Sequence, residues 1–353
     1  MRETMIPNNM TTVNLAELER FIYDAVAACG VPGDDCVKAV DVFMRATLRG
    51  VGHHDIYDLP SRISGLLSGK VNAKPQYKQL TAFKTMEAWD VDRGLGEVVC
   101  CFAMERAKRL ADEYGIGMCF IRNSNHFLAA APYVEQAAEE GYISLLLCKG
   151  GMNMGTTGRK ENCMGSLPLG FGFSTEADIP IVFDACLAYA SHGELRARAA
   201  KGIPVEPWWG VDTDGQPTTD PAKMLEGTRM PIGGHKGYAL SMLGEVLSGV
   251  FTGGWIMDQA PEEEAVDNHW GHTALVIKPD TMMDMATFKQ RTSTLLDRAD
   301  KLAPGVHIPG HGSYRRKAGM LSKGTIDLED SLVDKLTEIA ARLDITPLFN
   351  DRG

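Results

Sequence analysis

The sequence predicts an α/β protein in which a helical N-terminal domain precedes a layered α/β domain. Apolar residues recur at helical spacing over residues 15–67. From about residue 76, helical segments alternate with short apolar runs, which is typical of layered α/β domains. A chain of 353 residues can also bury two cores of moderate size.

Three helices are predicted in the N-terminal part. Asn14 can cap the first, and Asp34 and Asp35 are well placed to begin the second. Pro60 is a residue type favoured in the first turn, and it begins the third. The apolar positions at helical spacing in these segments are Leu15, Leu18, Ile22, Ala25, Val26, Val37, Val40, Phe43, Ile63, Leu66 and Leu67.

Helical and strand-like segments alternate in the second part of the chain. Residues 96–115 have a helical pattern, and a second long one covers residues 235–251. Four short apolar runs are typical of strands. They cover residues 117–122, 142–148, 180–185 and 273–279.

The tail from about residue 328 is amphipathic. Its apolar face consists of Leu332, Leu336, Ile339 and Leu343. Such a face can pack against the N-terminal helices, so that the C-terminal helix completes a discontinuous first domain. We therefore expect a helical domain of residues 1–75 and about 325–353, and an α/β domain of residues 76–324.

Charge and cysteine content argue against several classes of protein. A net charge of -10 argues against nucleic acid or an anionic membrane as the main partner. The first twelve residues do not have the pattern of a signal peptide, and no apolar run reaches membrane-spanning length. The eight cysteines include no CxxC pair and mostly lie in apolar runs, so we expect a cytoplasmic location.

Two common phosphate-binding motifs are missing. Neither GxGxxG between a strand and a helix nor GxxxxGK[ST] occurs in the required context. GGHKGYAL, residues 233–240, can hold an anion in another way, because small residues and Lys236 lie at a helix start. The alternative is an ordinary glycine-rich helix entry with a solvated lysine.

Two groups of histidines are candidate metal ligands. His53 and His54 are adjacent, and His307 and His311 lie in HIPGHG. Neither group has ligands spaced along one face of a helix, so we expect no metal site. A lone histidine is most often a hydrogen-bonded structural residue.

His54 and His126 have more informative surroundings. His54 follows a Gly-Val-Gly turn between two helices, and His126 lies where a strand gives way to a helix. Ligands commonly bind at such places in α/β proteins. Either ring can donate a proton near neutral pH.

Several stretches together resemble the malate/L-lactate dehydrogenase family, which lacks a Rossmann fold. They are LRGVGHHDIYDLP, RGLGEVVCCFAMERA, GIGMCFIRNSNHF, GSLPLGFGFST, DGQPTTDP, GGHKGYALSMLGEVLSGVFTGG, GHTALVI and IPGHG, in the family's order. The resemblance implies an NAD(P)-binding α/β fold with a mixed or largely antiparallel sheet. It also implies a homodimer that transfers hydride between NAD or NADP and a small 2-oxo acid, 2-hydroxy acid or imine.

The same resemblance assigns roles to residues. His54 falls on the family's proton donor, and His126 falls on a histidine with an acid/base role in some members. The candidate substrate-binding residues are Asp58, Arg62 and Asn125. Cofactor contacts fall on Asp184, Ala185, Cys186, His235, Lys236, Gly237, Pro309, Gly310 and His311.

Near the substrate the chain departs from the family's pattern. Asp58 stands where the family commonly has an arginine, and losing a carboxylate clamp costs on the order of several kcal/mol in a dry site. Ser166 and Leu167 replace Thr-Asn, Leu128 replaces a glycine, and residues 187–188 lack the family's hydroxyls. We therefore expect a substrate other than lactate or malate, either bulkier, less anionic or basic.

Several alternatives stay open. Arg62 can replace the missing arginine or pair with Asp58. The fold can also reduce a C=N bond, with Asp58 facing a basic substrate. A binding paralogue without activity would keep the fold, although the presence of both His54 and His126 argues against it. A metal-dependent hydrolase would use the HIPGHG histidines.

Overall fold

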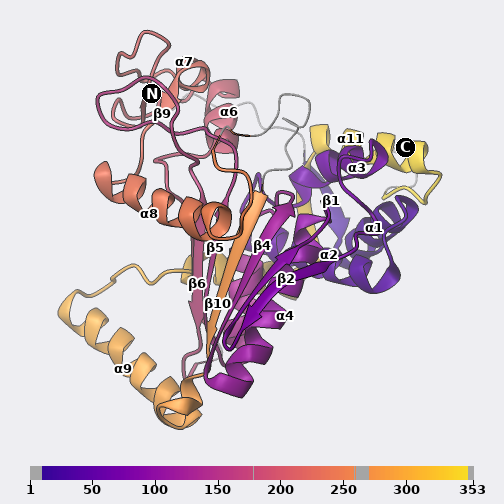
Figure 1. Cartoon of the computed structure of the whole chain (residues 1–353). Coiled ribbons are helices and arrows are strands. Elements are labelled where there is room, and N and C mark those ends of the chain that lie inside the picture. The colour runs from indigo at the N-terminus through magenta and orange to yellow at the C-terminus, as the bar shows by residue number, and fades with distance from the viewer. Residues whose placement is uncertain (1–9, 178, 258, 260–269, 349–353) are drawn as a thin grey trace. The chain divides into compact units, whose positions relative to one another are not determined.

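The computed structural model describes residues 10–177, 179–257, 259 and 270–348. The chain forms two compact units. The first joins the chain up to Lys74 with the chain from Gly312, and the second is Pro75–His311. Figure 1 shows the elements of each unit. Among the described residues, no helix combines the length and the apolar content that a membrane crossing requires.

The first unit has a helical core. Its packed helices are α1 (Leu15–Ala28), α2 (Gly33–Arg49), α3 (Leu59–Leu67) and α11 (Asp330–Leu343). Asn14 caps α1 as predicted, because its side chain accepts the N–H of Ala16 at 2.9 Å. The amphipathic tail forms α11, which packs against α1 and α3.

The buried face of α2 differs from the predicted one. Val37 is 60% exposed, whereas Cys36, Ala39 and Val42 are buried. Both the predicted and the observed positions recur every three residues, so helical spacing alone could not choose between them. Of the predicted positions in α2, Phe43 is buried.

A small sheet in the first unit was not predicted. Strand β1 (Met10–Asn14) pairs antiparallel with β11 (Thr325–Glu329). Each strand has five residues, which is too short for a reliable alternation pattern. The pairing joins two segments from opposite ends of the sequence within one unit.

The second unit is built on a mixed sheet. Among its described residues, seven strands follow the order β2-β3-β4-β10-β5-β6-β7. Strands β3 and β4 are parallel, and the other neighbours are antiparallel, which confirms the predicted mixed, largely antiparallel sheet. The strands are β2 (Lys78–Phe83), β3 (Met86–Asp90), β4 (Ile116–Ser124), β5 (Ile143–Lys149), β6 (Pro168–Phe173), β7 (Ile181–Cys186) and β10 (Trp270–Ile277).

Helices pack against this sheet. Helix α4 (Gly96–Tyr114) contacts β4 and β10, and it lies along these strands in Figure 1. Helix α5 (Ala131–Glu139) contacts β5, β6 and β7. The predicted helix over residues 235–251 is α8 (His235–Glu245), continued by a π-helical turn, η2 (Val246–Val250). That turn packs against β4, β5 and β10.

The remaining elements are short or lie on the surface. They are η1 (Ile56–Asp58), α6 (His192–Ala200), β8 (Gly210–Val211), α7 (Pro221–Glu226), β9 (Thr228–Arg229), η3 (Pro279–Thr281), α9 (Met285–Leu302) and α10 (His311–Lys323). Strands β8 and β9 pair antiparallel.

Candidate active site

The loop that carries His54 connects α2 with α3 in the first unit. The chain turns after α2 through Gly50 and Gly52, whose φ angles of 69° and 87° favour glycine. The carboxylate of Asp55 then accepts the N–H groups of Gly52 at 2.7 Å and Tyr57 at 3.1 Å. Burial raises the pKa of Asp55. Asp55 therefore shapes the loop, and His54 is held on it.

His54 and Asp58 form a hydrogen-bonded pair in this loop. Nδ1 of His54 lies 3.2 Å from Oδ2 of Asp58, and Nη2 of Arg62 lies 3.5 Å from the same oxygen. Burial acts to raise the pKa of Asp58, but the hydrogen bond with His54 and the charge of Arg62 hold that pKa below its usual value. An ionised carboxylate only accepts hydrogen bonds, so Nδ1 of His54 carries the donated hydrogen.

His126 follows β4 in the second unit, and its neighbour Asn125 fixes the backbone there. The side-chain amide of Asn125 donates to the carbonyl oxygens of Arg93 at 2.7 Å and Gly94 at 2.9 Å, which uses both of its hydrogens. The carbonyl oxygen of Asn125 lies 3.1 Å from Nε2 of His272. A carbonyl can only accept, so His272 donates. The Asn125 amide is therefore committed to holding the His126 turn.

The first turn of α4 lies against the same segment. A Cβ atom at Gly96 would lie 2.2 Å from the carbonyl oxygen of His126 and 2.6 Å from that of Asn125. Only glycine permits this approach without a shift of backbone. The close contact holds the His126 turn against α4.

The backbone after His126 sets the tautomer of its ring. The N–H of Leu128 donates to Nδ1 of His126 at 3.1 Å. Leu128 has a φ of 67°, a conformation that favours glycine, and its side chain is fully buried. Because Nδ1 accepts, the neutral ring of His126 carries its hydrogen on Nε2. The His126 ring also packs edge-on against Trp270, with centroids 4.6 Å apart.

The three predicted cofactor segments all belong to the second unit, at residues 184–186, 235–237 and 309–311. The first is the end of β7. A Cβ at Gly310 would lie 2.6 Å from the carbonyl oxygen of Val182 in β7. A Cβ at Gly237 would lie 2.8 Å from the carbonyl oxygen of Leu187, just after β7. Close backbone contacts therefore gather all three segments along β7 and its exit.

The start of α8 has a donor set that fits an anion such as a pyrophosphate. His235 and Lys236 are exposed there, at the positive end of the helix. The N–H groups of Lys236, Gly237 and Tyr238 already donate to backbone carbonyls. This segment can therefore bind an anion mainly through the side chains of His235 and Lys236 and the positive end of the helix, and less through its backbone amides.

Asp184 and Cys186 have local partners. Oδ2 of Asp184 accepts the N–H of Ala131 at 3.1 Å, which fixes the start of α5 to β7. The thiol of Cys186 lies 3.3 Å from the carbonyl oxygen of Ala188, and burial raises the pKa of Cys186. These contacts stabilise the segment that the sequence assigned to the cofactor.

Arg229 is a buried cation near this segment that the sequence reasoning missed. Its side chain donates to the carbonyl oxygens of Asn153 and Ala190, each at 3.0 Å, and to Oγ of Ser166 at 3.4 Å. Only 2% of the residue is exposed, and burial lowers its pKa to about 10. The arginine thus ties together three separate segments of the second unit.

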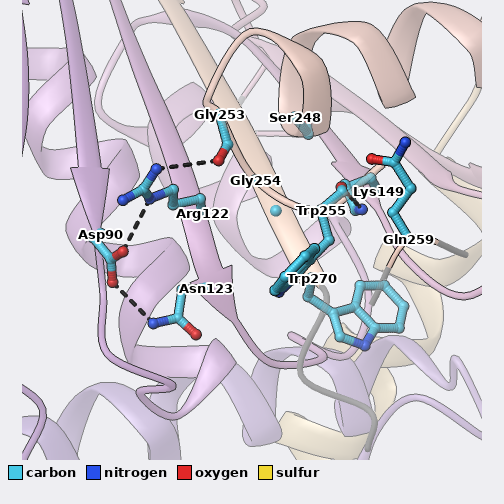
Figure 2. Close-up of a pocket in the computed structure, with 11 residues that line it drawn as sticks. Asp90, Arg122, Asn123, Lys149, Ser248, Gly253, Gly254, Trp255, Gln259 and Trp270 are labelled. Atoms are coloured by element: carbon cyan, nitrogen blue, oxygen red, sulfur yellow. Dashed lines mark hydrogen bonds and ion pairs between the residues drawn. The ribbon is translucent and has the colours of Figure 1, made fainter. Parts of the chain in front are cut away.

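A pocket of about 500 Å³ lies at one end of the sheet of the second unit (Figure 2). Its wall combines the ends of β3, β4 and β5, the start of β10 and the segment after η2. The lining residues are Asp90, Arg122, Asn123, Lys149, Ser248, Gly253, Gly254, Trp255, Gln259, Trp270 and Gly271. The sequence reasoning missed this pocket, because its wall is assembled from separate segments with no shared motif.

Two ion pairs support the pocket wall, the first half-buried and the second buried. Nε of Arg122 lies 2.9 Å from Asp90, which also accepts from the amide of Asn123 at 2.9 Å. Nζ of Lys149 lies 3.5 Å from Glu245 and donates to the carbonyl oxygen of Trp255. Lys149 is 1% exposed, and burial lowers its pKa. The charges of the wall are therefore largely balanced within it.

Comparison with known proteins is consistent across the chain. Residues 13–337 match the family described as malate/L-lactate dehydrogenase. An L-sulfolactate dehydrogenase of Methanocaldococcus jannaschii is 33% identical over 332 residues, covering 92% of this chain and 95% of the relative. A Delta(1)-pyrroline-2-carboxylate/Delta(1)-piperideine-2-carboxylate reductase of Pseudomonas putida is 32% identical over 289 residues, covering 80% and 84%. The solved structure of a sulfolactate dehydrogenase from Methanocaldococcus jannaschii has a TM-score of 0.87 at 31% identity, covering 95% of this chain and 98% of that one.

Proposed function

This chain belongs to the malate/L-lactate dehydrogenase family, and we propose that it is a nicotinamide-dependent oxidoreductase acting on a 2-oxo or 2-hydroxy acid. In the reducing direction, a 2-oxo acid gains a hydride at C2 and a proton on oxygen, which gives the 2-hydroxy acid. NAD or NADP, when bound, supplies the hydride chemistry. The protein has to supply the proton, the position of the substrate and the charge around it.

The observation that carries this proposal is the hydrogen bond from His54 Nδ1 to ionised Asp58 at 3.2 Å. This bond remains whether His54 is neutral or charged, so proton exchange is left to Nε2 of the same ring. Hydride arrival leaves negative charge on the substrate oxygen, and a proton donor within reach lowers the barrier. His54 is therefore the proton donor in our proposal.

His126 has a different role in the same reaction. Its Nδ1 accepts from the Leu128 N–H at 3.1 Å, so a second proton on the ring would cost this hydrogen bond. A neutral imidazole with its hydrogen on Nε2 can donate to a developing negative oxygen without giving up the proton. We assign His126 to this electrostatic role and His54 to proton transfer.

The predicted substrate residues divide into two kinds. Asp58 orients His54, and the amide of Asn125 holds the His126 turn, so both act as positioning residues. Arg62 is the cation of the predicted set, it lies 3.5 Å from Asp58, and a guanidinium group is well suited to bind a carboxylate through paired N–H donors. We therefore assign the substrate carboxylate to Arg62.

The cofactor is assigned to the three segments along β7. The glycines at 237 and 310 allow close approach of backbone, and Lys236 and His235 offer positive charge to a pyrophosphate. Asp184, Ala185, Cys186, Pro309 and His311 complete the proposed set. We also propose that the chain works as a homodimer in the cytoplasm, which light scattering of the purified protein and fractionation of cells would test.

A C=N reductase on the same fold is the second candidate. It is favoured by the 32% identity to the pyrroline- and piperideine-carboxylate reductase of Pseudomonas putida. A cyclic imino acid carries a basic nitrogen, and reduction would place the hydride on carbon and the proton on nitrogen. Oxidation of NADH and NADPH with piperideine-2-carboxylate, compared with pyruvate and oxaloacetate, separates the two candidates.

The test of the proposed function is steady-state turnover of His54→Gln and His126→Gln beside the unaltered chain. We expect loss of His54 to lower kcat by about 100-fold or more, since a general acid contributes that much. Protection of the protein by NADH without turnover of any acid in the panel would point instead to a binding paralogue. Brisk turnover of oxaloacetate alone would contradict the expectation of a substrate other than lactate or malate.

A further inference from the structure

The pocket at the end of the sheet is larger than a small acid requires. Its volume of about 500 Å³ falls within the range of roughly 300–1,000 Å³ typical of pockets for ligands with several rings or chains. The ends of β3, β4 and β5 and the start of β10 surround it. This is the edge of an α/β sheet at which ligands commonly bind.

Two tryptophans give this pocket an aromatic lining. Trp255 is 42% exposed although it is a large apolar side chain, and Trp270 is half-buried. The Trp270 ring also packs against His126, with centroids 4.6 Å apart. Figure 2 shows both indoles among the residues that line the pocket. One lining residue of the pocket therefore contacts the imidazole that we assign to the reaction.

The wall that carries Trp255 is built and anchored. Arg122 donates to the carbonyl oxygen of Gly253 at 3.1 Å, and buried Lys149 donates to the carbonyl oxygen of Trp255. Glu245 accepts the N–H of Met257 at 2.8 Å. Three charged side chains thus fix the backbone on both sides of the exposed indole, which is what a rigid aromatic platform requires.

The charges in the pocket do not favour a substrate that carries a second carboxylate on its side chain. Arg122 is paired with Asp90 at 2.9 Å, and Lys149 lies 3.5 Å from Glu245. A neutral, flat group gains from contact with the indoles and leaves both ion pairs intact. A charged side chain would have to compete with Asp90 or Glu245 for the same cations.

From this geometry, and resting on the proposed function, we propose that the pocket takes the side chain of the substrate and that this side chain is aromatic. The substrate class is then an aryl-substituted 2-oxo acid, such as phenylpyruvate, and its 2-hydroxy product. Trp270 of the pocket lining contacts His126, which we assign to the reaction, and this contact is why we assign the aromatic side chain of the substrate to this pocket.

The experiment compares kcat/KM for phenylpyruvate, pyruvate and oxaloacetate in four proteins. These are the unaltered chain, Trp255→Ala, Trp255→Phe and Trp208→Ala. Trp208 is 57% exposed and lies outside the pocket lining, so it is the matched control. We expect phenylpyruvate to be preferred, Trp255→Ala to lower the phenylpyruvate-to-pyruvate ratio about tenfold, and the other two variants to keep it.

A binding measurement separates this inference from the proposed function. Calorimetric titration with phenyllactate needs no turnover, and we expect Trp255→Ala to weaken the affinity about tenfold. Equal kcat/KM for phenylpyruvate and pyruvate, with a ratio that Trp255→Ala leaves unchanged, would overturn the aromatic assignment while the oxidoreductase stands. If no acid is turned over, weaker binding of phenyllactate to Trp255→Ala would still support the aromatic assignment of this pocket. Equal binding of phenyllactate to Trp255→Ala and to the unaltered chain would refute that assignment.

Discussion

The side chains of His54 and Asp58 are joined through Nδ1 and Oδ2 at 3.2 Å, and this bond can persist whether the ring carries one proton or two. His126 is arranged the other way, because its Nδ1 accepts the N–H of Leu128. A second proton on the ring would keep the hydrogen bond of His54 and would cost that of His126. This difference separates two histidines that the sequence places in similar surroundings.

Asp58→Asn should lower kcat by about 100-fold while the protein stays folded. The substitution removes the charge that stabilises a protonated His54, so the reaction in the reducing direction loses its acid. The descending limb of kcat against pH should also move to lower pH, because Asp58 interacts favourably with a charged His54 ring. Stopped assays of NADH oxidation across the pH range measure both effects.

The matched control is Asp41→Asn. Asp41 pairs with Arg45 at 2.9 Å one turn away in α2, just as Asp58 pairs with Arg62, but without a histidine. We expect this variant to keep the kcat and the pH profile of the unaltered chain. If Asp58→Asn has the same pH profile of kcat as the unaltered chain, Asp58 is only a structural residue.

Gly96→Ala should destabilise the protein and disturb the His126 turn. The added methyl would meet the carbonyl oxygen of His126 at 2.2 Å, so backbone must shift. Overpacking of this kind costs about 1–3 kcal/mol in the free energy of unfolding. Gly319→Ala in α10 is the control, because a Cβ there meets nothing within 4 Å. Urea unfolding of both variants checks the prediction. Equal free energies of unfolding for the two variants would contradict it.

Much of the fold could be predicted from long periodic segments. The helices at residues 15–28, 96–114 and 330–343 have apolar faces several turns long, and the apolar runs that became β4, β5, β7 and β10 are unmistakable. Strands β2, β3 and β6 were missed, because β2 is largely exposed and β6 alternates glycine with apolar residues. Short half-exposed strands are set by their sheet neighbours more than by their own sequence.

The candidate site could be predicted only in part. The surroundings of His54 and His126 were informative, because glycine turns and strand ends leave a local pattern. Nothing local shows that Asp58 bonds to His54, that Lys149 holds the carbonyl of Trp255, or that Trp270 meets His126. The last two contacts join residues more than a hundred positions apart, so they depend on the folded topology.

Lys149→Met should be among the most damaging single substitutions in the second unit. It leaves Glu245, whose side chain is 6% exposed, without its buried cation. Breaking such a pair costs about 3–5 kcal/mol in the free energy of unfolding.

The double variant Lys149→Met/Glu245→Leu should recover a large part of that loss, since neither charge is then buried alone. Urea denaturation of the two single variants and the double variant gives the coupling energy. Removal of the exposed pair Arg20–Asp24 is the control, with an effect below about 1 kcal/mol. Additive single effects at Lys149 and Glu245 would contradict the role given to this pair.

The stability of the protein should fall below about pH 6.5, in part because of His272. This ring is fully buried, its Nε2 donates to Asn125, and its Nδ1 has no hydrogen-bond partner among the described residues. Burial therefore lowers the pKa of His272 to about 3. Between that value and about pH 6.5, His272 binds a proton in the unfolded chain but not in the folded chain. The contribution of His272 to the free energy of unfolding is therefore fully present above this pH range and decreases as the pH falls through it.

His272→Gln removes this titration while its amide can still donate to Asn125. From about pH 7 to about pH 5, the unaltered chain should lose up to about 2 kcal/mol more than the variant, since each pH unit in the window is worth about 1.4 kcal/mol per histidine. His307→Asn, at an exposed position, should follow the unaltered chain. Urea unfolding at both pH values measures the difference. Parallel pH dependence of His272→Gln and the unaltered chain would mean that the His272 ring accepts a proton inside the folded protein.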